Sequence, residues 1–274
     1  MGIHGDSEGL EEAVFWCFAR MGRSWNKPHE SHLVNVEIAD LCGGLISSES
    51  SLIPSRDWIV HGRLAMSMDT PNTNSAFQDQ AKYGCYLAAA AIDLFARYGA
   101  SEGAFGSVMT KSQEVSYTEA WQQLWTEIDC WFDRRRPEMQ PVSARRQPET
   151  DPSQPFPSVL YLNGAAIASA QIVHTAAILM LQRRPRHLRL KIIRPMLWHA
   201  RQVCAIASSN NHHGSWTNSV QPLWIAGKLM SHPSEHQAIV KILIKIECTT
   251  GWSTQNRIED LKTYWGDIDN EFLY

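Results

Sequence analysis

A long and almost wholly apolar segment, residues 159–182, constrains the fold of this chain more than any other feature. It reads VLYLNGAAIASAQIVHTAAILMLQ, with one histidine and few other polar side chains. A helix that is hydrophobic on every face needs neighbouring elements to cover all of it. The segment therefore predicts a helix in the middle of a helical core.

The rest of the chain also favours helices. Apolar residues recur at helical spacing in 10–21, 58–65, 77–98, 195–208, 216–230 and 254–265. Capping boxes at Ser116/Glu119 and Ser234/Gln237 predict two more helices that begin near those residues. No alternating strand pattern of useful length is present. We expect an all-α fold, one domain over residues 1–274 with about ten helices.

A proline-rich stretch, residues 137–157, interrupts this helical pattern. It holds six prolines, and proline removes the backbone donors that helices and sheets need. We expect a long exposed connector on the surface of the domain.

Composition excludes several classes of function. The 25 Lys and Arg residues against 28 Asp and Glu give a net charge of −3, without the basic field that nucleic-acid binding needs. No apolar run reaches the length of a membrane span. The six cysteines form no CxxC pair, and the N-terminal residues lack a secretory pattern, so we expect a cytoplasmic protein. Eleven tryptophans are unusually many and would suit a hydrophobic pocket.

Several runs in the second half resemble a known family. QPLWIAGKLMSHPSEH, TGW and DLKTYWG are similar to segments of the C-terminal helical domain of fungal binuclear-zinc-cluster transcription factors, and residues 116–267 are the best match. The resemblance implies the helical fold and a regulatory role. It supplies no catalytic residues, because that family consists of regulators.

Two departures from the family pattern are informative. The zinc-cluster module uses six clustered cysteines, which are absent here, so we expect no direct DNA binding. The first predicted helix keeps Phe15 and Trp16 but carries Ala19, Met21 and Gly22 where the family has polar residues. This change indicates a more apolar interior.

The candidate site follows from polar residues that two predicted helices bring to one turn, NNHHG at 210–214. Helices on both sides of this turn should pack together, so their polar groups would project between them or bond to each other. As catalytic candidates we select His199, Arg201, Lys228 and His174. As substrate-binding candidates we select Trp16, Trp25, Trp58, Gln221 and Trp224.

Metal, cofactor and phosphate chemistry lack motif support. His232 and His236 are four residues apart, but Pro233 and the predicted cap Ser234 leave His232 outside the helix, so we expect no metal. No nucleotide or flavin motif is present, and we expect no cofactor. The basic run at 183–194 is better interpreted as a solvated connector than as a phosphate or nucleic-acid patch.

Two functions remain open. We favour a cofactor-independent cyclase, pericyclase or isomerase that folds a lipophilic fungal secondary metabolite in a closed apolar cavity, as in a Diels-Alder reaction. The alternative is a stand-alone transcriptional regulator domain that binds a small effector or a partner protein in the nucleus. The first predicts a lipophilic small-molecule substrate, and the second predicts a small effector or a partner protein. For both we expect no membrane, and we leave a homodimer open.

Overall fold

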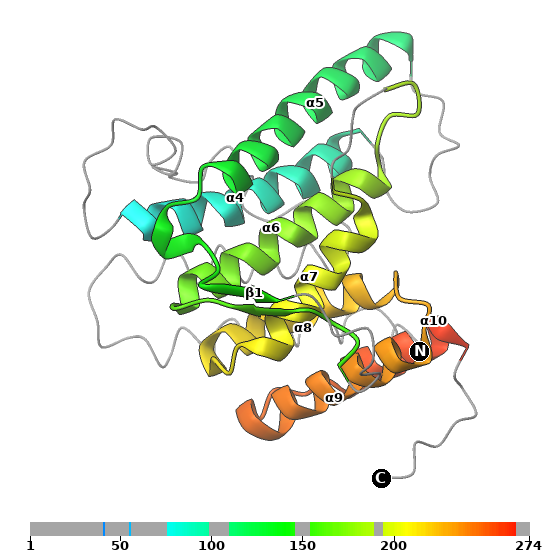
Figure 1. Cartoon of the computed structure of the whole chain (residues 1–274). Helices are drawn as coiled ribbons and strands as arrows, with labels where there is room; N and C mark the ends of the chain where they lie inside the picture. The colour runs from blue at the N-terminus through cyan, green and yellow to red at the C-terminus, as the bar shows by residue number, and fades with distance from the viewer. Residues whose placement is uncertain are drawn as a thin grey trace, which may run out of the picture.

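The computed structural model describes residues 41, 55, 76–98, 110–145, 154–188 and 194–266. Over these residues the chain is mostly helical, as Figure 1 shows, and the all-α class is confirmed. The described α-helices are α4 (Ala76–Arg97), α5 (Lys111–Asp133), α6 (Gly164–Gln182), α7 (Met196–Ser209), α8 (His213–Gly227), α9 (Pro233–Thr250) and α10 (Gln255–Trp265). The helices predicted at 10–21 and 58–65 lie outside the described residues.

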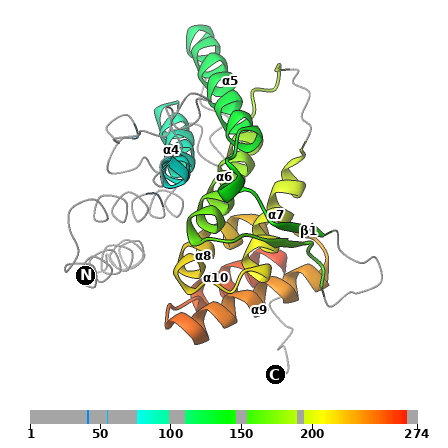
Figure 2. The ribbon, with the colours of Figure 1, turned by 60° about the vertical axis from the view of Figure 1, so that its left-hand side comes forward.

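Helix α6 occupies the centre of these helices, as the apolar segment predicted. It packs against α4, α5, α7 and α8, and both views show it between them (Figures 1 and 2). Asn163 caps its start by accepting a hydrogen bond from the Ala166 backbone N–H at 2.8 Å. By length and composition alone α6 could cross a membrane, but most of its surface is buried in the bundle.

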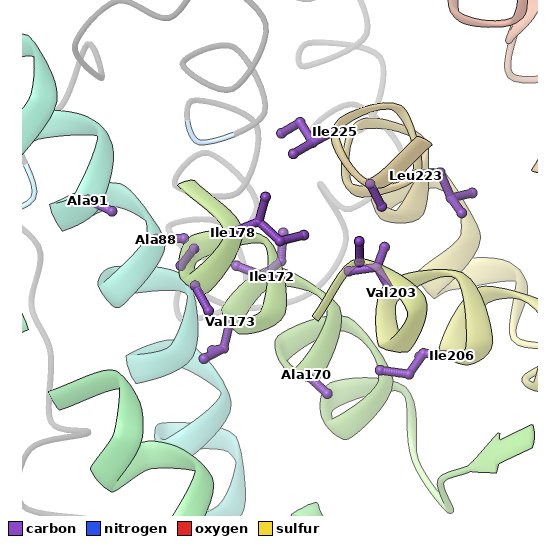
Figure 3. Close-up of a cluster of buried hydrophobic side chains, with 14 of the residues drawn as sticks. Ala88, Ala91, Ala170, Ile172, Val173, Ile178, Val203, Ile206, Leu223 and Ile225 are labelled. Atoms are coloured by element: carbon purple, nitrogen blue, oxygen red, sulfur yellow. The ribbon is translucent and has the colours of Figure 1, made fainter. Parts of the chain in front are cut away.

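Aliphatic side chains fill the space around α6. Figure 3 shows how those of α4, α6, α7 and α8 gather in one cluster. The labelled residues are all buried: Ala88, Ala91, Ala170, Ile172, Val173, Ile178, Val203, Ile206, Leu223 and Ile225. Because small residues on α4 face larger ones on α6, these two helices approach closely.

Two buried tryptophans of α5 form hydrogen bonds to the neighbouring helices α6 and α4. The Trp121 indole N–H donates to the Met180 carbonyl at 3.0 Å, and the Trp131 N–H donates to the Gln80 carbonyl at 3.0 Å. The helix begins at Lys111, not near Ser116, because Thr110 and Gln113 form the capping box. The predicted cap was therefore wrong by six residues, which is between one and two helical turns.

The proline-rich stretch contains short regular elements instead of forming only a connector. A 3₁₀ turn, η2, spans Pro137–Met139, and strands β1 (Ser143–Arg145) and β2 (Ser158–Leu160) pair antiparallel. Met139 and Phe156 are buried, while β1 is mostly exposed. Because residues 158–160 are extended, the central helix begins five residues later than predicted.

Helices α9 and α10 pack below α8 (Figures 1 and 2). His232, not Ser234, is the N-cap of α9: its Nδ1 accepts from the Ser234 N–H at 3.2 Å, and Glu235 bonds back to the His232 N–H. His232 thus lies outside the helix, as predicted, but the residue chosen as the cap was wrong.

Candidate functional site

The structure brings together only some of the predicted site residues. Trp16, Trp25 and Trp58 lie outside the described residues. His174 of α6 and His199 of α7 are in contact. The other candidates lie in two separate places. Arg201 faces α9. Gln221 and Trp224 lie on α8 and Lys228 lies at its end, and both Trp224 and Lys228 are close to α10.

The histidine pair is the most unusual polar contact in the described core. The Nδ1 atoms of His174 and His199 are 3.0 Å apart, and both side chains are buried. One ring must donate its Nδ1 proton and the other accept it, so a neutral pair satisfies this contact. The His199 Nε2 atom is also buried and makes no hydrogen bond.

Aromatic rings and two arginines surround the pair. The Phe132 ring of α5 lies 4.7 Å from the His174 ring, centroid to centroid, and the Trp198 ring lies 5.1 Å from that of His199. The guanidinium groups of Arg135 and Arg194 each lie 5.5 Å from the Phe132 centroid. The histidines thus face apolar rings and positive charge.

These surroundings keep both rings neutral at pH 7. Burial lowers the pKa of His199 to about 3, helped by the Arg194 guanidinium and opposed in part by the Arg194 backbone carbonyl. Burial also lowers the pKa of His174 well below its usual value, and His199, Arg135 and Arg194 add to this effect. A neutral pair can donate or accept one hydrogen bond, but it is a poor proton donor near pH 7.

Arg201 has a structural partner. Its guanidinium binds Glu235 Oε1 at 2.7 Å through Nη2 and at 3.1 Å through Nε. Glu235 is almost fully buried and also bonds to the N-cap of α9. The contact therefore ties α7 to the start of α9 and is separate from the contact of His174 on α6 with His199 on α7.

A second polar group lies on α8. Lys228 Nζ lies 3.6 Å and Arg257 Cζ lies 4.8 Å from the Trp224 ring centroid, close enough for cation–π contacts. The Gln221 Oε1 and Trp224 Nε1 atoms are buried without hydrogen-bond partners. This group is distinct from the histidine pair.

Sequence reasoning missed Arg135, Arg194 and Phe132 as neighbours of the histidines. Arg194 ends the basic run that was interpreted as a solvated connector, and Arg135 follows α5. Neither arginine belongs to a sequence motif, so nothing in the sequence indicates that they lie near the two histidines. Among the described residues, no group of three or more His, Cys, Asp or Glu could hold a metal ion.

Comparison with known proteins gives one similarity to a regulator. The chain is 32% identical over 78 residues to the transcription activator AMTR1 of Alternaria alternata. The match covers 28% of this chain and 10% of the length of the activator. No family model matches the chain, and no solved structure matches it. The similarity agrees with the resemblance to a fungal transcription factor region, and nothing in these comparisons supports cyclase activity.

Proposed function

We propose that this chain is a helical regulatory region of a fungal-type transcription regulator, which changes transcription when it binds a small effector or a partner protein. The observation that carries the proposal is the 78-residue similarity to a transcription activator. The proposal expects the protein to act in the nucleus.

The geometry of the predicted catalytic residues favours this function over a cyclase. His199, Arg201 and Lys228 each contact a different helix and do not surround one space. Arg201 neutralises a buried carboxylate, which is a structural task. A cyclase site needs donors aimed at a single reacting carbonyl.

A tethering experiment tests the proposal. The full chain is fused to a heterologous DNA-binding domain in a fungal host, and reporter transcription is measured against the DNA-binding domain alone. We expect a change of at least fivefold in either direction. Val173→Asp, which introduces a charge into the buried core, should abolish the change at equal protein level.

The control variant is Val115→Asp, at an exposed position on α5, which should leave the reporter response intact. If the fusion is folded, nuclear and bound at the reporter, yet transcription stays at the level of the DNA-binding domain alone, the proposed function is wrong.

A further inference from the structure

Two arginines converge on one aromatic ring at the corner where α5 ends and α7 begins. Each guanidinium carbon lies 5.5 Å from the Phe132 centroid, so the two charged groups are no farther apart than twice this distance. Two cations held this close repel each other. An anion that binds between them would remove the repulsion.

Arg135 is held in place without a carboxylate. Its Nε donates to the Phe132 carbonyl at 3.1 Å, and its Nη1 lies 3.4 Å from the Tyr161 hydroxyl. Among the described residues no Asp or Glu forms an ion pair with it. Its backbone and hydroxyl contacts orient the group and leave its charge unbalanced.

The positive charge of Arg194 is only partly neutralised by nearby carboxylates. Asp133 Oδ1 lies 3.9 Å from its Nη2, and that carboxylate is 71% exposed, so water screens the pair. Asp129 also faces Arg194, and burial is the main cause that raises the pKa of Asp129. The two carboxylates stand on the Arg194 side of this corner, whereas Arg135 has no ion-pair partner among the described residues.

The start of α7 adds to this positive potential. Pro195 is the N-cap and provides no side-chain hydrogen bond to the first turn of this 14-residue helix. Backbone N–H groups at an uncapped helix start attract anions. Arg194 precedes this turn directly, so its charge and the helix start act at the same place.

An independent observation comes from His199 in the same turn. Its side chain is more than nine-tenths buried, yet Nε2 has no hydrogen-bond partner. A buried polar atom without a partner is costly. If His174 donates its Nδ1 proton to His199, the His199 Nε2 carries a proton and can donate it to an oxygen atom of a ligand.

The rim of this corner is apolar. Leu197 and Trp198 are 43% and 37% exposed, large values for such side chains in a structured helix. Trp198 also contacts both histidine rings. A ligand with an apolar group beside its charge would cover this surface.

We propose that the corner formed by Arg135, Arg194, His199 and Trp198 binds the carboxylate of a small apolar acid. A planar carboxylate suits a guanidinium fork, and Arg135 has no carboxylate partner among the described residues. The inference rests on the proposed function only in naming this acid as the effector of the regulator.

The experiment measures binding to the full chain by titration calorimetry and tryptophan fluorescence. The probe is phenylacetate, with phenylacetamide as the uncharged analogue and inorganic phosphate as the anion without an apolar group. We expect phenylacetate to bind at least tenfold more tightly than either. Arg135→Gln should weaken phenylacetate binding at least tenfold, and His199→Phe should weaken it at least threefold.

Arg145→Gln, at an exposed position on β1, is the matched control and should bind as the wild type does. Circular dichroism checks that each variant is folded. Equal affinity of wild type and Arg135→Gln for phenylacetate, or tighter binding of phosphate, would overturn the proposal. The reporter assay is separate: a response to tethering without phenylacetate binding contradicts this site alone, and binding without a response contradicts the proposed function.

Discussion

The Nδ1 atoms of His174 and His199 lie 3.0 Å apart although the two residues belong to different helices, α6 and α7. Burial lowers the pKa values of both rings, that of His199 to about 3. In the unfolded chain each histidine has a pKa of about 6.5. Unfolding at mildly acidic pH therefore takes up protons, and acid destabilises the folded state.

This contact predicts how stability depends on pH. Above about pH 6.5 both states hold neutral histidines, so this contribution is constant. As pH falls from about 6.5 toward 3, we expect each histidine to lower the free energy of unfolding by about 1.4 kcal/mol per pH unit. Urea denaturation between pH 5 and 7.5 measures the slope. The double variant His174→Phe/His199→Phe should show a flatter slope, and equal slopes would contradict the buried neutral pair.

The close approach of α4 and α6 predicts that Gly84→Ala is destabilising. A methyl group at Gly84 would lie 2.9 Å from Val173 Cγ2 and 3.3 Å from Trp131 Nε1, in a packed core. Overpacking costs about 1–3 kcal/mol, and the gain in helix propensity of about 1 kcal/mol only partly offsets it. We expect a net loss of up to about 2 kcal/mol in urea denaturation.

Gly227→Ala is the matched control for Gly84. Its new methyl group would meet the end of the flexible Leu261 side chain at 2.9 Å. Leu261 is buried, but its branched end can shift more easily than the Cγ2 of the β-branched Val173, so we expect a smaller loss than at Gly84. A larger loss at Gly227 than at Gly84 would show that the α4–α6 contact is not the tighter one.

The Arg201–Glu235 contact predicts a structural and not a catalytic effect. Arg201→Met leaves the nearly buried Glu235 carboxylate without its cation, but Arg201 is itself 46% exposed and water replaces part of the contact. We expect a loss of about 1–2 kcal/mol. In a double-mutant cycle with Glu235→Gln, the double variant should lose less free energy of unfolding than the sum of the two single variants. Full additivity would show that the two side chains do not interact.

Trp131 and Trp265 each donate an indole N–H to a backbone carbonyl, but their replacement by Phe should change stability by different amounts. Trp131→Phe removes a fully buried indole and leaves the Gln80 carbonyl without this donor, so we expect a loss of about 2–3 kcal/mol. Trp265→Phe removes a bond to the Gly227 carbonyl at a half-buried position. Water can replace that bond, and we expect a loss of about 1 kcal/mol or less. Thermal melting compares the two variants.

The existence of the helices within the described residues could be predicted from the sequence, but several of their ends could not. Ser116/Glu119 and Thr110/Gln113 both fit the capping-box pattern, and only the folded chain shows that the second begins α5. The strands were missed because three-residue segments carry no periodicity. Residues 143–145 become extended only by pairing with 158–160, and this pairing is a tertiary contact.

The sequence by itself determined that 159–182 would supply the central helix, because an apolar surface on every face leaves a helix no stable position except the interior. It also selected His174 and His199 as separate candidates. Only the tertiary structure decided that the two rings meet and that Arg135 and Arg194 stand beside them. The physical reason is that local periodicity fixes which face of a helix is buried, whereas the packing of α5, α6 and α7 fixes which polar side chains share one place.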